Sequence, residues 1–406
     1  MKLFNKLIIA LFIVSALAFN ANAEAKLVPY YSLNVGEGIA VPNKGEYLFG
    51  LNLTNDIGLL FSPTKESDHR ILAFYELKYV GPGLHKQEGE KFSDRWMDHI
   101  SMLRYNYSID KYTAVKVQLD YMIEYKRTGT NEVWGNGLYD FTRTGFVLGV
   151  SRTFLEKLET EFNYGYHSLD FPNYTDLLAE FQSGGGATAE SSAGKQNNTM
   201  SQFGISAKYG NSRAFFDSTS MPYDKQKVIT ETKQTDGTYY SAALQKDTIL
   251  SFGVSHTQKL FNFVLVSPAL NYKIKNSNQN FQNFATATST VPVQYFGNYY
   301  GYTEYSFELP LSLLLSRKWE FNYTLEYNWK DYVDRQPRDS DGNFVDGKQH
   351  NYLSIMSVGF TYKPNEVTRT TFFYSYQAQT SNMKFEKYLP YNYDGHYFGI
   401  NFNYTY

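Results

Sequence analysis

The sequence has no cysteine among its 406 residues, which excludes a disulfide framework and any metal site ligated by cysteine. Proline is scarce, at 12 residues, and the formal net charge of −2 gives no basic excess for nucleic acid. After the N-terminal segment there is no run of about 20 apolar residues, the length that a membrane-spanning helix needs. The sequence therefore predicts a protein with neither disulfides nor transmembrane helices, and nucleic acid is not an expected partner.

Aromatic residues, by contrast, are abundant. They make up 18% of the chain, with 37 Tyr and 31 Phe, although the mean hydropathy is only −0.45. A membrane β-barrel combines these properties, because one face of each strand meets lipid while the other meets water. The length alone also fits two or three soluble domains. Composition therefore favours one large barrel and leaves the soluble alternative to be decided by the pattern along the chain.

The first 23 residues have the three regions of a secretory signal peptide. Lys2 and Lys6 supply the positive charge, residues 7–19 are apolar, and Ala21-Asn-Ala23 is an A-x-A cleavage site. The apolar region is shorter than a bilayer-spanning helix, which favours cleavage over a retained anchor. No cysteine follows the site, so there is no thiol to carry a lipid anchor. We expect this segment to be removed and residues 24–406 to form one exported domain.

Residues 112–126 give the clearest strand signal. Side chains alternate across a strand, whereas a helix of period 3.6 would mix the two sets. Similar alternation recurs in residues 158–167, 304–315, 320–330 and 369–377. Several segments are long enough to cross a hydrocarbon layer, for which about 9–11 tilted residues are needed. In residues 112–126 one face carries Thr113, Val115, Val117, Leu119, Tyr121, Ile123 and Tyr125, and the other carries Lys116, Gln118, Asp120, Glu124 and Lys126.

The connections between predicted strands alternate between two kinds. Short turns at the periplasmic rim and long loops at the extracellular rim are the layout of bacterial membrane barrels. The short turns lie near residues 110–111, 156–157, 211–212, 258–259, 317–318 and 364–365, and the longer polar loops lie near residues 81–96, 127–137, 170–199, 221–238, 277–298, 334–350 and 381–394.

We therefore predict an all-β fold, a transmembrane antiparallel up-and-down β-barrel. Under the even-number rule for such barrels, the strand count is about 14 if the barrel starts near Arg70. It is about 16 if residues 27–34 and 47–61 form a first hairpin. We favour the larger count because Tyr47, Phe49, Leu51 and Leu53 alternate cleanly.

The segment 397–406 alternates as strictly as any internal strand. One face carries Phe398, Ile400, Phe402, Tyr404 and Tyr406, and the other is small or polar; the sequence then stops on Tyr406. This pattern resembles the C-terminal signal strand by which the assembly machinery recognises bacterial outer-membrane β-barrels; the alternative is an edge strand of a soluble sheet. Together with the turn and loop layout, the resemblance covers the mature chain. It implies an integral protein of a diderm bacterium's outer membrane, with lipid and the barrel assembly machinery as partners.

Within this class the sequence is similar to porins, without a motif of any one subfamily. The resemblance implies a channel for passive diffusion of small hydrophilic solutes or ions. A homo-oligomer such as a trimer is compatible with it, although no subunit interface is identifiable. A barrel of about 16 strands is usually wide enough for an aqueous channel. The alternative is a non-conducting surface barrel that displays its loops for binding or adhesion.

The predicted interior face carries charges of both signs in similar numbers. Lining charges set the ion preference of a pore by their local field, so this mixture predicts weak selectivity. In a filled interior the same residues would instead pair across strands. The candidates are Glu76, Lys78, Arg104, Lys116, Asp120, Glu124, Lys126, Arg143, Glu159, Glu161, Lys273, Lys275, Glu304, Glu308, Glu320, Glu326, Lys330 and Arg369.

The loop at residues 170–199 is the most distinctive. Thr175 can cap a short amphipathic turn that carries Leu177, Leu178 and Phe181, and Gly184 begins a glycine triplet that ends it. One interpretation is a loop that folds inward and narrows the channel. The other is a surface loop whose apolar residues cover a strand rim, since long loops more often concentrate mobility.

Three of the four tryptophans, Trp96, Trp319 and Trp329, lie near predicted strand ends. In membrane barrels, aromatic side chains gather in girdles at the two membrane–water interfaces. We predict that these three belong to such girdles. Trp134 lies in a predicted loop, and its sequence context favours neither rim packing nor ligand contact.

Candidate chemistry elsewhere is sparse. The segment around Asp339, Asp341 and Asp346 resembles part of a calcium loop, but it lacks the terminal Glu, and Asp-Gly pairs are more simply turn formers. His167 and Ser168 are adjacent, so on a strand they face opposite sides and cannot pair. Motifs of the known nucleophile classes are absent from the sequence. We expect no metal, no cofactor and no enzymatic activity.

Overall fold

The computed structural model describes residues 25–43, 47–64, 66–81, 95–128, 133–174, 195–235, 237, 239–283, 294–386 and 390–406. Strand accounts for 73% of these described residues, and no helix among them is both long and apolar enough to span a membrane. The strands are β1 Lys26–Pro42, β2 Leu48–Ser62, β3 His69–Gly81, β4 Arg95–Ser108, β5 Thr113–Arg127, β6 Phe141–Phe154, β7 Leu158–Asp170, β8 Asn198–Tyr209, β9 Ser212–Ile229, β10 Tyr240–His256, β11 Gln258–Leu260, β12 Val264–Val266, β13 Ala269–Ser277, β14 Phe281–Asn283, β15 Gln294–Phe296, β16 Tyr302–Leu314, β17 Trp319–Tyr332, β18 His350–Tyr362, β19 Thr368–Ser381 and β20 Tyr393–Thr405.

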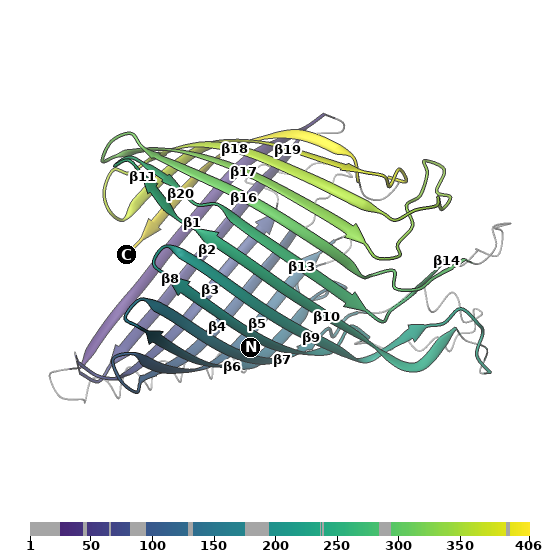
Figure 1. Ribbon diagram of the computed structural model, residues 1–406, viewed down its shortest axis with the longest axis horizontal. Coiled ribbons are helices and arrows are strands. Elements are labelled where there is room, and N and C mark those ends of the chain that lie inside the picture. Colours follow the sequence, from purple (N-terminus) through teal and green to yellow (C-terminus); the bar gives the residue numbers. More distant parts are fainter. Residues whose placement is uncertain are drawn as a thin grey trace.

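The sheet closes on itself between its first and last strands. Neighbouring long strands pair antiparallel in chain order, and β1 pairs with both β2 and β20. The sheet has 18 strands, of which β11 and β12 are three-residue extensions of one hairpin, leaving a closed barrel of 16 strands. The predicted count of 16 is confirmed, because β1 and β2 supply the first hairpin. Figure 1 shows the tilted strands and the closure of β1 beside β20.

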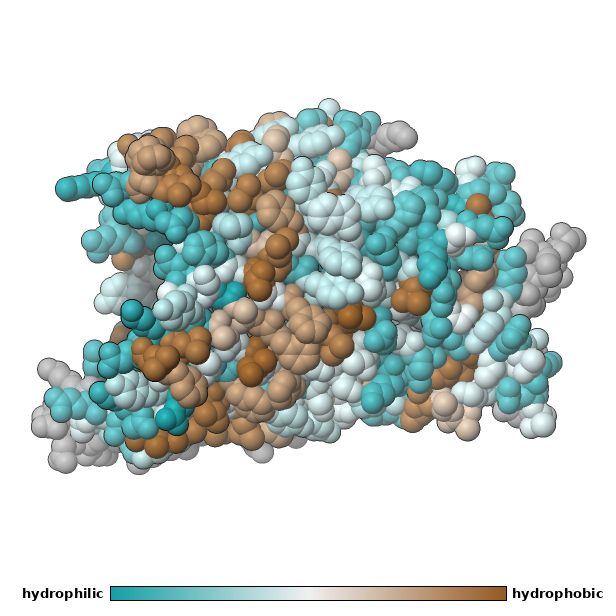
Figure 2. Space-filling model, viewed as in Figure 1, coloured by the Kyte–Doolittle hydropathy of each residue, from teal (hydrophilic) through white to brown (hydrophobic). Residues whose placement is uncertain are grey.

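The two faces of the barrel wall differ as the alternation predicts. On the outer face of β5, Val117 and Leu119 are 42% and 56% exposed, whereas Asp120 and Met122 on the inner face are 7% and 8% exposed. The outer face of the other strands likewise carries exposed Leu, Val, Phe and Tyr side chains. Figure 2 shows these apolar patches over the strands and a more hydrophilic surface toward the long connections. Apolar side chains exposed around a closed barrel identify a wall that faces lipid.

A belt of aromatic rings crosses six neighbouring strands of the outer face. Consecutive ring centroids lie between 4.6 and 6.4 Å apart, within the range of about 4.5–7 Å that aromatic pairs prefer. The chain of contacts runs Phe162–Phe203 (4.9 Å), Phe203–Phe216 (6.3 Å), Phe216–Phe252 (4.9 Å), Phe252–Tyr272 (6.4 Å) and Tyr272–Tyr305 (4.6 Å). Cross-strand aromatic pairs each stabilise a sheet by up to about 1 kcal/mol. The belt therefore helps to fix the register of β7 to β16.

Two of the three tryptophans predicted to belong to interfacial girdles face outward, as a girdle requires. Trp319 and Trp329 lie on the outer face and are 44% and 38% exposed. Trp96 instead pairs in register with Lys126 and shares the inner face with Asp98. The prediction for Trp96 was wrong because it used position near a strand end and ignored the alternation, which places every second residue of β4 inside.

Short turns and long loops separate to opposite rims, called here the turn rim and the loop rim (Figure 1). Two predicted connections differ from the structure. β9 and β10 remain paired, with register shifts, up to Ile229 and Tyr240, so the predicted loop at 221–238 shortens to residues 230–239. The predicted turn at 258–259 is displaced to residues 261–263, because β11 and β12 extend that hairpin. In both places polar or exposed residues continue the hydrogen-bonded strand pairing. Such residues lack the alternation of apolar and polar side chains from which the strands were predicted.

Two turns at the turn rim share one device. The Asp110 Oδ1 atom accepts hydrogen bonds from the backbone N–H groups of Tyr112 (2.7 Å) and Thr113 (2.8 Å). Asn365 Oδ1 accepts from those of Val367 (3.0 Å) and Thr368 (2.8 Å) in the same way. These Asx turns redirect the chain in a few residues. The hydrogen bond from Tyr112 and that from Thr113 lower the pKa of the Asp110 carboxyl.

Candidate functional site: the barrel interior

The interior face gathers the charged side chains that the sequence singled out. Strand register places them on the same side of the wall as Asp120, opposite the exposed apolar residues. The twelve principal candidates on this face are Lys116, Asp120, Glu124, Glu159, Glu161, Lys273, Glu304, Glu308, Glu320, Glu326, Lys330 and Arg369.

Many of these charges are paired across strands. Lys116 Nζ lies 2.7 Å from Glu161 Oε1, across the intervening β6. Lys116 is the register partner of Gly149, and a Cβ atom there would lie 2.6 Å from Lys116 Cε, so the missing side chain leaves room for the lysine to cross β6. Lys208 and Glu159 lie 3.4 Å apart nearer the turn rim and are more than half exposed. Partial solvent exposure makes such pairs individually weak, at about 0–1 kcal/mol.

A second group of charges lies on β13, β16 and β17. Glu304 accepts from Lys273 at 3.1 Å and from Lys330 at 2.8 Å, one amine for each carboxylate oxygen. Lys275 pairs with Asp247 at 3.0 Å on the neighbouring strand pair. The Asp247 carboxylate also accepts from Ser277 Oγ at 2.6 Å, which accounts for its burial at 2% exposure. Three lysines therefore meet two carboxylates, and this part of the wall is locally positive.

A further buried contact of the interior joins two residues that the sequence analysis did not pair. His167 Nε2 lies 3.2 Å from Asp120 Oδ2, and Arg143 Nε lies 3.7 Å from Asp120 Oδ1. Asp120 and His167 are 7% and 3% exposed. Sequence reasoning compared His167 only with its neighbour Ser168. The missed signal is Gly145, which lies between Asp120 and His167 in the register of β5, β6 and β7.

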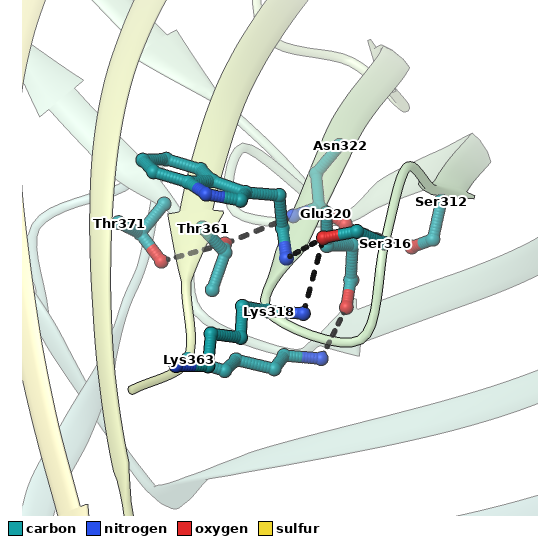
Figure 3. A network of polar contacts seen from close by, with 9 residues as sticks. Ser312, Ser316, Lys318, Glu320, Asn322, Thr361, Lys363 and Thr371 are labelled. Atoms are coloured by element: carbon teal, nitrogen blue, oxygen red, sulfur yellow. Dashed lines mark hydrogen bonds and ion pairs between the residues drawn. The ribbon is translucent and has the colours of Figure 1, made fainter. Parts of the chain in front are cut away.

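The charged part of the wall ends at β17 and β18 near the turn rim. There, Glu320 pairs with Lys363, and the Ser316 hydroxyl accepts the backbone N–H groups of Lys318 (3.2 Å) and Trp319 (3.1 Å), as Figure 3 shows. A neutral ladder then continues around the barrel. It comprises the contacts Ser312–Asn322 (2.8 Å), Asn322–Thr361 (3.1 Å) and Thr361–Thr371 (2.9 Å). The interior thus changes from ion pairs to hydroxyl and amide groups at β18.

Some interior carboxylates face another carboxylate, as in the register pairs Asp56–Glu76 and Asp98–Glu124. Glu308 and Glu326 are direct register partners on β16 and β17. Asn328 Nδ2 donates to Glu326 Oε1 at 2.6 Å, and no ion pair to either Glu is present among the described residues. Like charges directly opposite each other disfavour pairing of the strands. They also make this level of the wall locally negative.

At the loop rim, ordered contacts connect several loops. The Arg335 guanidinium lies 4.8 Å from the ring centroids of both Tyr299 and Tyr332, and donates to the Tyr391 hydroxyl at 3.2 Å. Arg338 stacks 4.1 Å from the centre of Phe344. Gln349 is fully buried, and its backbone N–H donates to the Arg335 carbonyl oxygen at 2.7 Å. These contacts, which include cation–π interactions, hold three loops in one arrangement.

The loop predicted at 170–199 is only partly described. Phe171 packs on the inner-face residue Phe141, with centroids 5.2 Å apart, and Asn173 donates to the Gly137 carbonyl at 3.2 Å. The segment 175–194, with the predicted cap at Thr175 and the apolar turn, lies outside the described residues. Constriction by this loop therefore remains a prediction.

The Asp-rich segment at residues 339–346 forms a turn. The Asp339 carboxylate accepts from the backbone N–H groups of Asp341 (3.0 Å) and Asn343 (2.9 Å) and from the Asn343 side chain (3.1 Å). These bonds, with that from the Asn343 side chain as the largest cause, lower the pKa of Asp339. Its oxygens therefore serve the turn itself. Among the described residues, no group of three or more His, Cys, Asp or Glu side chains is arranged to hold a metal ion.

Comparison with solved structures finds outer-membrane β-barrels at low sequence identity. An in-vitro folded OmpT, an outer membrane protein of Vibrio cholerae, is 11% identical, with a TM-score of 0.48 over 94% of this chain and 98% of that chain. An anion-selective porin from Comamonas acidovorans is 10% identical, with a TM-score of 0.47 over 94% and 100%. The P. putida toluene transporter TodX is 8% identical, with a TM-score of 0.34 over 97% and 92%. No protein-family model and no curated protein matches the sequence.

Proposed function

We propose that the protein is an outer-membrane channel for the passive diffusion of small hydrophilic solutes or ions. The observation that carries this proposal is the interior of a closed 16-strand barrel lined by charged, amide and hydroxyl side chains. Barrels of about this strand number enclose an aqueous channel, whereas about eight strands leave room only for side chains. A wet interior spares a polar solute the cost of entering hydrocarbon without hydrogen-bond partners.

The location follows from the wall. Its outer face is apolar and aromatic while its backbone groups are paired around the whole circumference, which satisfies both requirements of a lipid-facing barrel. We place the turn rim in the periplasm and the loop rim at the cell surface, as in bacterial membrane barrels. The segment with Phe398, Ile400 and Phe402 on its outer face would then be read by the assembly machinery before the barrel closes.

Ion selectivity is expected to be weak. The lysines near Glu304 make one part of the wall locally positive, whereas Glu308 and Glu326 make another part locally negative. Paired charges contribute less net field than isolated ones, and salt screens them over about 8 Å at physiological ionic strength. A passing ion therefore meets opposing fields in sequence. The protein needs no catalytic step for this role.

The test is single-channel conductance of the mature barrel, refolded in detergent and inserted into a planar lipid bilayer. Ohmic steps that recur between preparations are the expected result. A heat-modifiable, correctly folded barrel that gives no steps would overturn the channel. Deleting residues 176–196 and measuring the unit conductance then tests whether the 170–199 loop narrows the channel. An unchanged unit conductance would rule out that constriction.

A second candidate is a surface barrel whose loops bind a partner. The observation in its favour is the ordered loop-rim cluster, in which Arg335 and Arg338 stack on aromatic rings from several loops. Ordered loops lower the entropy cost of binding. Absence of conductance in the folded protein, together with unchanged folding, would favour this candidate over the channel.

A further inference from the structure

One wall of the interior differs in chemistry from the rest. On the inner face of β18, β19, β20 and β1, the described charged side chains are Lys26 and Arg369, both at turn-rim ends of their strands. The other side chains of this face are amides, hydroxyls, aromatic rings, a few aliphatic groups and glycines. Strands β5 to β17 carry the ion pairs described above, and we call their inner face the charged wall. We call the inner face of β18, β19, β20 and β1, apart from Lys26 and Arg369, the neutral wall.

Two aromatic rings are set into the neutral wall by glycines. A Cβ atom at Gly38 would lie 2.6 Å from the Cζ and hydroxyl of Tyr397, so that ring occupies the space above Gly38 on the next strand. A Cβ at Gly399 would lie 2.5 Å from Cζ of Phe373, which covers Gly399 in the same way. The two ring centroids are 5.4 Å apart, with planes tilted by 40°. One face of each of these two rings lies against the backbone of a glycine, and the opposite face is directed to the barrel interior.

Hydrogen-bonding groups lie beside these rings on the same face. Gln377 Nε2 donates to the Tyr393 hydroxyl at 2.8 Å, which leaves its carbonyl oxygen without a partner among the described residues. Ser357 and Ser375 share a hydroxyl contact of 2.7 Å, and each hydroxyl retains further accepting capacity. The wall therefore alternates flat apolar faces with neutral donors and acceptors. Tyr391, which follows Tyr393 toward the loop rim, also contacts Arg335.

We propose that the neutral wall is a binding track for neutral polyhydroxylated solutes of the saccharide class, an inference that rests on the proposed channel function. A pyranose ring has an apolar face of C–H groups that fits against an aromatic ring, and an edge of hydroxyls that exchanges hydrogen bonds with amides and hydroxyls. Binding sites of this kind combine apolar or aromatic surface with a few placed polar groups. Weak, repeated contacts suit passage, because a solute must leave each site as well as enter it.

The charged wall makes a poorer surface for such a solute. Its side chains are engaged in ion pairs such as Lys116 with Glu161 and Lys273 with Glu304. A neutral solute would have to displace these charge-assisted bonds, which are stronger than the neutral bonds that it could offer in return. The track therefore follows β18 to β1. An anionic or cationic solute would favour the opposite side of the interior.

The experiment uses the mature barrel in a planar bilayer, with maltotriose added and interruptions of the ionic current recorded. In the wild-type protein, blocking should increase with maltotriose concentration. In the double variant Phe373→Leu with Tyr397→Leu, which keeps apolar volume but loses both flat faces, the half-blocking concentration should rise about tenfold, as a modest loss of binding energy implies. The matched control Phe372→Leu, on the outer face of the same strand, should block as the wild type does.

The outcomes separate the two proposals. Channels that conduct salt but are never interrupted by maltotriose, or that are interrupted equally in the double variant, overturn the binding track and leave the channel intact. A folded barrel without conductance overturns the channel. In that case saturation-transfer NMR of maltotriose with the refolded barrel tests the track by itself: transfer in the wild type that is lost in the double variant supports it, and no transfer overturns it.

Discussion

The Asp120 carboxylate and the His167 imidazole lie 3.2 Å apart although their strands, β5 and β7, are not neighbours. Gly145 on β6 lies between them in register, and a Cβ there would come within 2.3 Å of the His167 ring. The absent side chain lets the two groups meet across the intervening strand. The Arg143 guanidinium, 3.7 Å from the same carboxylate, adds a cationic partner. The arrangement joins three strands through one buried polar contact.

Replacing Asp120 should therefore destabilise the barrel more than replacing a solvated interior carboxylate. Asp120→Asn keeps a hydrogen-bond acceptor for His167 but removes the charge that faces Arg143. We expect a loss of about 1–3 kcal/mol, as for a buried polar group that loses a charged partner. The measurement is urea unfolding of the refolded barrel. Asp217→Asn, at an exposed interior position of β9, is the matched control and should change stability little; equal losses in the two variants would contradict the argument.

Gly38 and Gly36, two residues apart on β1, offer a sharp comparison. A Cβ at Gly38 would lie 2.6 Å from the Phe398 carbonyl oxygen and from the Tyr397 ring, whereas at Gly36 the nearest atom is 3.8 Å away. Gly38→Ala should therefore displace the Tyr397 ring and cost about 1–3 kcal/mol, as overpacking typically does. Gly36→Ala should be nearly neutral. The two urea midpoints measure the difference, and coincident midpoints would show that the ring does not occupy the space above Gly38.

The alternation of apolar and polar side chains along the sequence was sufficient to predict the barrel fold. In β5, Val117 and Leu119 point outward and Asp120 inward, as a period of two requires. Where both faces of a strand are polar, as in β9 up to Ile229, alternation carries no signal and the predicted loop was too long. Contacts across a strand were also beyond reach, because pairing His167 with Asp120 requires the register of two hairpins and the recognition of Gly145. The register between strands depends on the turn lengths, and residue propensities locate the ends of turns only approximately.

Glu304 lies between Lys273 and Lys330 and directs one carboxylate oxygen to each amine. Glu304→Gln leaves two half-exposed ammonium groups without their carboxylate and raises the local charge by one unit. We expect the reversal potential in a salt gradient to shift toward anion preference, with a stability loss of about 1 kcal/mol or less because the pairs are partly solvated. Glu308→Gln is the control for total charge. It changes the net charge by the same one unit, at a position without a lysine partner among the described residues. Equal shifts would mean that the ion pairs do not set the local field.

Asp110 should give the turn rim an acid-dependent contribution to stability. Its pKa is lowered in the folded protein by the backbone N–H groups of Tyr112 and Thr113, from an ordinary value of 3.8. The stabilisation is therefore complete above about pH 4 and is lost as the pH falls through the lower, folded-state pKa. Asp110→Asn should keep the turn, since Asn365 makes the same two bonds elsewhere. The stability difference between wild type and variant, measured from pH 6 to pH 2, should change in that acid range; a constant difference would contradict the assignment.

The outer face of β20 bears on assembly. Phe398, Ile400 and Phe402 are 47%, 42% and 38% exposed in the closed barrel, and the strand is held to β1 by a backbone ladder that their side chains do not enter. Replacing Phe402 with Ser should therefore leave the ladder intact and reduce the rate at which cells convert the protein to its heat-modifiable form. Refolding into detergent, which needs no assembly machinery, should be affected much less. A recognition signal affects folding only where the assembly machinery is present. Equal slowing of both processes would therefore mean that Phe402 acts through the lipid-facing surface of the finished barrel.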